Sequence, residues 1–379
     1  MLASKRRRVK YLALLILLIH ASNSIRDRTK LHRCSLLSHN ESPWIKLYRH
    51  GDASSFLNMT GLTRHAFSLL HDVLFVGQQP QRMGRPRLME STAQLGLFLF
   101  YLGSTMGMKH LCMIFGITPS TCSEVIDKML HLVVRKLKRH PMAAVKFPDA
   151  EKMEYFARLI NQREPEVDDV IGFMDGLSLV SECTSEVFEQ NAMYNGYHSE
   201  TMVNNIIAYG PDGKVFLAAI NFPGSWHDGS ITANILPYIR ERIGNYKMCV
   251  DQGFPRSGDA SFILVGPISR RQARRLAANL RQYLLTISNV YVSLRQASEW
   301  GMRGLQGTFP RFKKRLPGNA FKRSLVIKSI VFIHNFRTEI VGLNQIRTVF
   351  DPEYERYISL HGYDRIRRYY FTNDDVYDD

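Results

Sequence analysis

The sequence predicts a mixed α/β protein in which a helical N-terminal region precedes a core built on a mixed sheet. Two observations predict this class. Apolar residues recur at helical spacing through residues 62–137, and after Pro148 the pattern changes to short β-branched runs separated by turn signals. The 379 residues, 45% of them hydrophobic, are enough for two packed units of ordinary size.

The helical region is predicted to contain a helix-turn-helix-like pair. Its helices are expected over residues 62–76, 93–102, 108–115 and 120–137. A tight break at Gly116 separates the last two, with Thr118 placed as N-cap and Pro119 at the first helical position. The final helix carries polar side chains that could contact DNA, namely Ser120, Thr121, Ser123 and Lys128. An ordinary αα-hairpin would give the same pattern.

The core is predicted to alternate strands with helices. Strands are expected over residues 170–175, 201–209, 215–221, 246–251 and 262–265. A Pro-Asp-Gly turn at 211–213 makes the second and third strands a hairpin. Helices are expected over residues 230–243, 268–285, 291–305 and 324–341.

Three acidic residues stand at special places in this pattern. Asp175 and Asp251 each end an apolar strand, and Glu299 lies on the helix expected at 291–305. Carboxylates at two strand ends and on a covering helix can converge on one point, where oxygen ligands hold hard cations. Two cations about 4 Å apart stabilise both the attacking and the leaving oxygen of a phosphodiester. The alternative is that each acid only caps a strand or faces solvent.

The charge of the chain indicates a polyanionic partner. The net charge is +16. Between Arg256 and Arg323 there are fourteen lysines or arginines against two acids, a net of +12. Such a run is typical of a track for a phosphate backbone, although a solvated face would look the same. The five cysteines show no CxxC spacing, so they indicate neither a zinc site nor a disulfide framework.

The N-terminal segment supports two interpretations. A basic cluster at residues 5–10 precedes an apolar stretch at 11–19 and then small residues around Ala21. This order is typical of a secretory signal peptide, and the basic cluster is also typical of a nuclear localisation signal. With a basic body poor in disulfide signals, we expect a nuclear protein, and secretion is the alternative.

Five segments, taken in order, resemble the PIF/Harbinger-type transposases and the nucleases derived from them. They are Met174-Asp175-Gly176, Pro223-Gly224-Ser225-Trp226-His227-Asp228, Val250-Asp251-Gln252-Gly253-Phe254-Pro255, Glu299-Trp300-Gly301-Met302-Arg303 with Arg311-Phe312-Lys313-Lys314-Arg315, and Ile333-His334-Asn335-Phe336. The resemblance covers roughly residues 60–345. It implies an RNase H-like fold and a DDE endonuclease or transposase that cuts, and can join, DNA strands with two Mg²⁺ or Mn²⁺ ions.

The resemblance also implies roles for individual residues. Asp175 would bridge both ions, Asp251 would hold one and Glu299 the other. DNA contacts are expected from basic residues on or after the glutamate helix, namely Arg295, Arg303, Arg311, Lys313, Lys314 and Arg315. Two accessory candidates are His227 and Asp228. His227 would orient substrate or a metal-bound water, or only stabilise its loop.

The expected organisation has four parts: a basic and apolar segment at 1–25, a helical DNA-binding domain at 26–145, the nuclease domain at 165–345 and a tail at 346–379. The expected partners are double-stranded DNA, a Myb/SANT-like DNA-binding protein and a second copy of the chain. The alternative function is a domesticated transposase that binds DNA but no longer cuts it.

Overall fold

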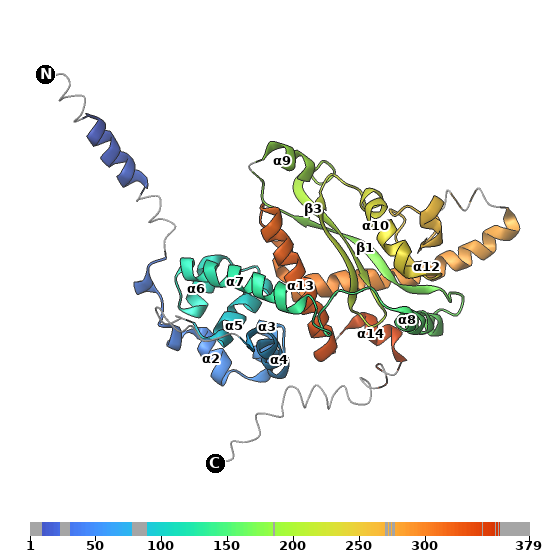
Figure 1. Cartoon of the computed structure of the whole chain (residues 1–379), viewed down its shortest axis with the longest axis horizontal. Coiled ribbons are helices and arrows are strands. Elements are labelled where there is room, and N and C mark those ends of the chain that lie inside the picture. Colours follow the sequence, from blue (N-terminus) through green and yellow to red (C-terminus); the bar gives the residue numbers. More distant parts are fainter. Residues whose placement is uncertain are drawn as a thin grey trace, which may run out of the picture.

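The computed structural model describes residues 10–22, 31–77, 89–184, 186–269, 277–342 and 344–352, with the single residues 272, 274, 354 and 356. Residues 10–22 are helical and exposed. No helix among the described residues is long and apolar enough to cross a membrane. A helical region and a sheet core lie beside one another, with the helix α13 running between them (Figure 1).

The helical region packs around one buried tryptophan. Its helices are α2 (Pro43–His50), α3 (Ala53–Thr60), α4 (Arg64–Phe75), α5 (Ser91–Leu102), α6 (Met108–Phe115) and α7 (Pro119–Leu137). Trp44 is completely buried. A Cβ on Gly96 would stand only 2.3 Å from the Trp44 ring, closer than the two atoms can approach. The helix α5 can therefore approach α2 closely only because residue 96 is glycine.

The core is a six-stranded mixed sheet. Its strands are β1 (Val170–Val180), β2 (Tyr194–Asn195), β3 (Glu200–Tyr209), β4 (Val215–Pro223), β5 (Lys247–Val250) and β6 (Leu264–Val265). The order is β2-β3-β1-β5-β6, with β4 also paired to β3. Strands β1, β3 and β4 are antiparallel, whereas β5 and β6 run parallel to β1 and to each other. The predicted RNase H-like mixed sheet, preceded by helices, is thus confirmed.

Helices cover both faces of the sheet. One face packs on α8 (Ala150–Arg163) and α10 (Asp228–Ile243), and the other on α12 (Ala278–Thr308) and α13 (Ala320–Ile340). Short elements complete the described chain: α9 (Val187–Met193), α14 (Gln345–Phe350) and 3-10 turns at Arg33–Ser35, His39–Glu41, Gly258–Phe262 and Pro310–Lys313.

One apolar core extends from the helical region into the sheet. It includes Phe98 of α5, Val133 of α7, Ile330 of α13 and Phe173 of β1. The helix α13 also ties the two parts by hydrogen bonds. Asn335 accepts from the Val215 N–H at 2.7 Å, and the Arg337 guanidinium donates to the Gly61 carbonyl at 2.9 Å.

Two expected elements are corrected by the structure. The segments 268–285 and 291–305 were expected as separate helices, but residues 278–308 form the single helix α12. The strand expected at 170–175 continues to Val180, because β3 pairs antiparallel with β1 along residues 173–180. Asp175 therefore lies within β1 and does not end it.

Candidate active site

The sheet register brings Asp175 and Asp251 together. Met174 of β1 pairs with Val250, the last residue of β5, so the next residue on each strand is one of the two acids. Parallel pairing stops at this point, and Asp251 lies just past the end of β5. Asp175 is half-buried, and the side chain of Asp251 is 44% exposed. The pair is therefore open to solvent on the Asp251 side.

The helix α12 carries Glu299 to the same place. The guanidinium of Arg295, one turn earlier on α12, lies 2.7 Å from a Glu299 carboxylate oxygen and 3.6 Å from Asp251 Oδ1. The single hydroxyl proton of Ser298 has two acceptors within reach, the Arg295 carbonyl at 2.8 Å and Asp175 Oδ2 at 3.4 Å. Two residues of one turn of α12 thus contact all three predicted acids, Ser298 reaching Asp175 and Arg295 reaching Asp251 and Glu299.

A fourth carboxylate, Asp228, lies against these acids at the N-terminal end of α10. A Cβ on Gly176 would stand only 2.6 Å from Asp228 Oδ1, so the glycine after Asp175 leaves the space that this carboxylate fills. The loop before α10 is held down at Gly224, where a Cβ would lie 2.4 Å from the carbonyls of Met193 and Met202. The His227 side chain caps no backbone N–H of α10, and the residue is exposed.

Burial and neighbouring negative charges raise the pKa values of Asp175 and Asp228. Burial raises the pKa of Asp175 to about 6, the negative charges of Asp251 and Asp228 add to the rise, and the Gly176 N–H and Arg295 oppose it. Burial and Asp251 likewise raise the pKa of Asp228, against the effect of His227. Repulsion of this kind is characteristic of carboxylates gathered without enough positive charge between them.

The donor set fits a hard divalent cation in its chemistry. Asp175, Asp228, Asp251 and Glu299 supply carboxylate oxygens, which Mg²⁺ and Mn²⁺ prefer. Their present spacing is not that of a metal cage, and no cluster of three metal-ligating side chains occurs among the described residues. The Arg295 guanidinium takes the place between Asp251 and Glu299 where a cation would neutralise both.

The predicted DNA-contacting residues lie in three surroundings. Arg295 is ion-paired in the site, and Arg303 is exposed farther along α12. Arg311 is half-buried, with its guanidinium 4.3 Å from the Tyr101 ring centre of α5. The last three form an exposed basic strip after α12, Lys313, Lys314 and Arg315.

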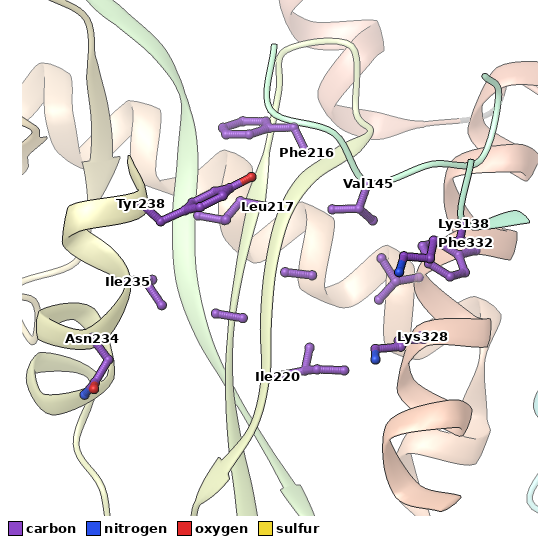
Figure 2. Close-up of a pocket in the computed structure, with 13 residues that line it drawn as sticks. Lys138, Val145, Phe216, Leu217, Ile220, Asn234, Ile235, Tyr238, Lys328 and Phe332 are labelled. Carbon is purple, nitrogen blue, oxygen red and sulfur yellow. The ribbon is translucent and has the colours of Figure 1, made fainter. Parts of the chain in front are cut away.

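A separate cavity of about 460 Å³ lies between α10, the edge strand β4 and α13 (Figure 2). Phe216, Leu217 and Ile220 line its apolar wall, and its charged lining residues are Lys138 and Lys328. No carboxylate lines it, so this cavity is not where the acids could act on a substrate.

The sequence alone did not single out two residues of the site. Ser298 reaches Asp175, and Gly176 both donates its N–H to Asp175 Oδ1 at 2.8 Å and makes room for Asp228. The Asp-Gly pair at 175–176 was a signal for the second of these. No sequence signal pointed to Ser298, because its contact with Asp175 depends on which face of α12 packs toward β1.

The mixed sheet thus places carboxylates at two neighbouring strands, β1 and β5, and one sequence comparison matches the segment that contains them. Residues 174–335 match the family model described as DDE superfamily endonuclease, a range that includes all three predicted acids. This part of the chain is thus similar to DDE superfamily endonucleases, which supports the expected kinship with transposase-derived nucleases. No curated protein and no solved structure matches the chain.

Proposed function

We propose that this protein is a metal-dependent DNA endonuclease that cuts phosphodiester bonds with a DDE site. The observation that carries the proposal is the β1–β5 register, which sets Asp175 beside Asp251, and Arg295 links Asp251 to Glu299. The family match supports DNA as the substrate, and the density of basic residues around Glu299 agrees with it.

In this proposal the chain's own residues arrange the reaction. Asp175, Asp251 and Glu299 would hold two Mg²⁺ or Mn²⁺ ions, which when bound supply Lewis-acid stabilisation of charge on the phosphate oxygens. Ser298 and the Gly176 N–H contact the Asp175 carboxylate, and the Asp251 and Glu299 side chains, each 44% exposed, remain accessible to a substrate. Arg295 would then turn from the carboxylates toward a phosphate.

The experiment is a nicking assay on supercoiled DNA with and without Mg²⁺ or Mn²⁺. Wild type should nick only with the ion, and Glu299→Gln should lower the rate at least a hundredfold, on the order of the loss seen when one electrostatic group of an active site is removed. Glu241→Gln is the matched control, because Glu241 is an exposed acid on α10 paired only with its neighbour Arg242. Equal rates in all three proteins would reject the proposal.

A second candidate is a domesticated transposase that binds DNA without cutting it. The observation that favours it is the pair of contacts from Arg295, whose positive charge offsets the charges of Asp251 and Glu299. Wild type that binds DNA but shows no ion-dependent nicking would favour this candidate.

We propose that the helical region assists target choice. The expected pair of helices is present as α6 and α7, joined through Gly116 in a left-handed conformation. Part of α7 is occupied by other contacts, because Lys322 of α13 pairs with Asp127 and the Lys128 ammonium donates to Gln94. A Myb/SANT-like partner would supply the base contacts that this surface lacks.

A further inference from the structure

Exposed aromatic side chains gather on the segment that connects β1 to β3. Phe188 of α9 is 90% exposed and Tyr197 is 92% exposed, and Tyr194 is also exposed. Large aromatic side chains so open to solvent cost free energy in water, and a group of them on one segment indicates a binding surface. We call Phe188, Tyr194 and Tyr197 the aromatic platform.

The platform is built on fixed backbone. The Asn195 side chain donates to the Gly224 carbonyl at 2.8 Å and accepts from the backbone N–H groups of Tyr197 and His198 at 3.0 and 3.2 Å. The turn that follows places Ser199 at a φ of 54°, a left-handed conformation that a serine adopts only when its surroundings hold it there. These hydrogen bonds fix the backbone of the turn that carries the exposed Tyr197 side chain.

One side of the platform adjoins the loop that leads to the active site. The Ser225 N–H donates to the Ala192 carbonyl at 3.1 Å, and the Asn204 amide donates to the Trp226 carbonyl at 2.7 Å. The same loop reaches Asp228 two residues later. A nucleic acid bound along this loop therefore passes from the carboxylates to the platform.

The other side adjoins the exposed basic strip Lys313, Lys314 and Arg315. Arg315 pairs with Glu200 at 3.0 Å, three residues after Tyr197. Leu316 follows the strip and bonds the first strand, its N–H donating to the Val180 carbonyl at 2.9 Å and its carbonyl accepting from Glu182 at 2.8 Å. Positive charge thus runs beside exposed aromatic rings.

We propose that the aromatic platform and the basic strip together bind unpaired DNA bases next to the cleavage site. Basic side chains that follow a phosphate backbone and aromatic rings on which bases stack are the two features of single-strand binding surfaces. In a duplex the base faces are already stacked on one another, so an intact double helix would use only the basic strip. The inference rests on DNA being the substrate, as proposed above.

The test measures binding without divalent ions, so that it does not depend on cleavage. Fluorescence anisotropy of the full chain compares a blunt 20-base-pair duplex with the same duplex carrying a six-nucleotide single-stranded extension. Wild type should bind the extended duplex more tightly. The double variant Phe188→Ala, Tyr197→Ala should lose roughly tenfold or more of that affinity and keep its affinity for the blunt duplex.

A control variant and a fluorescence measurement distinguish base stacking on the platform from a general effect of removing exposed aromatic rings. Phe262→Ala with Tyr283→Ala removes two aromatic rings that are 73% and 63% exposed, one on the 3-10 turn Gly258–Phe262 and one on α12, and it should bind like wild type. A 2-aminopurine in the extension should be quenched by wild type and by Tyr197→Trp, and not by the double alanine variant.

The outcomes distinguish this inference from the proposed nuclease. Preference for the extension that is lost in the double variant supports the platform, even in a protein that cuts no DNA. Equal affinity for blunt and extended duplexes in wild type overturns the platform, and leaves the nuclease standing if ion-dependent nicking is observed. Loss of affinity for both DNAs in the double variant also overturns it, since stacking on bases would spare the blunt duplex.

Discussion

At the scale of the residue, the carboxylates of the site are held in positions that destabilise the folded protein. Asp175 lies half-buried in β1, beside Asp251 and Asp228, and its raised pKa shows that the fold disfavours its charge. The Gly176 N–H and the positive charge of Arg295 only partly oppose this rise in pKa. A residue that is costly to the fold and is still held in place by neighbouring donors is characteristic of a functional site.

Replacing Asp175 with asparagine should therefore stabilise the protein at neutral pH. A rise in pKa from 3.8 to about 6 corresponds to an unfavourable free energy on the order of 2–3 kcal/mol for the charged form, which the neutral amide avoids. We expect Asp175→Asn to raise the melting temperature by a few degrees in calorimetry and to abolish nicking. Asp259→Asn, at an exposed acid, should change neither. A lower melting temperature for Asp175→Asn would contradict this account of the site.

Arg295 should compete with metal ions for the carboxylates. Its guanidinium neutralises Asp251 and Glu299 at distances where charges interact strongly. We expect Arg295→Gln to bind Mn²⁺ severalfold more tightly than wild type in the absence of DNA, as followed by electron paramagnetic resonance of the free ion. The control is Arg303→Gln, an exposed position on the same helix, which should bind like wild type. Weaker binding by Arg295→Gln would show that the guanidinium organises the site instead of occupying it.

At the scale of the element, sequence patterns predicted most of the strands and helices that position the site. The helix at 108–115 has the predicted bounds, and the strands that lead to Asp175 and Asp251 begin within a residue of their expected positions. Sequence patterns were insufficient where tertiary contacts determine the bounds of an element. The interval between the helices expected at 268–285 and 291–305 is itself helical, because α12 continues through it, and Ser288 in this interval accepts a hydrogen bond from the Ile268 N–H. The contacts of Arg295 with Asp251 and Glu299 could not be predicted from sequence, because they depend on how α12 packs against β1 and β5.

The helix α13 should make folding sensitive to acid through His334. Burial lowers the pKa of this imidazole to about 4, the positive charge of Arg337 lowers it further, and the Gly213 carbonyl opposes the shift. Tyr209 packs edge-on against the ring at 6.1 Å. The folded protein favours the neutral imidazole, because its folded-state pKa lies below the ordinary 6.5. The contribution of His334 to the free energy of unfolding is therefore fully present above about pH 6.5 and is lost as the pH falls toward 4.

Urea unfolding checks this expectation. His334 should contribute a loss of about 2 kcal/mol in the free energy of unfolding between pH 7.5 and pH 5. His334→Gln should be less stable at pH 7.5 and should show a smaller loss on acidification. An unchanged pH dependence in the variant would mean that other groups control the acid sensitivity.

At the scale of the whole molecule, the charge distribution and the shared core matter most. The apolar core that joins Phe98, Ile330 and Phe173 makes the helical region part of the support for the sheet. A deletion of the helices would expose the covered side of α13. Point substitutions on the surface are therefore the cleaner way to separate DNA binding from folding.

The basic strip should control the salt dependence of duplex binding. Each phosphate contact contributes about −0.9 to the slope of log K against log salt concentration. We expect Lys313→Ala, Lys314→Ala and Arg315→Ala in one protein to reduce the magnitude of the slope by roughly two to three. A control with three exposed arginines replaced elsewhere, Arg158, Arg240 and Arg242, should keep the wild-type slope. The opposite pattern would place the backbone track on α8 and α10.

The central claim is that Asp251 acts chemically at the end of β5. The most direct test is the single-turnover rate of Mg²⁺-dependent nicking by Asp251→Asn, measured on protein whose melting temperature shows it to be folded. Asp259→Asn, eight residues later, replaces an exposed acid paired with Arg240 and serves as the control. The account predicts wild-type nicking by the control and a loss of at least a hundredfold in Asp251→Asn. A folded Asp251→Asn that nicks DNA at the wild-type rate would contradict the assignment of this site.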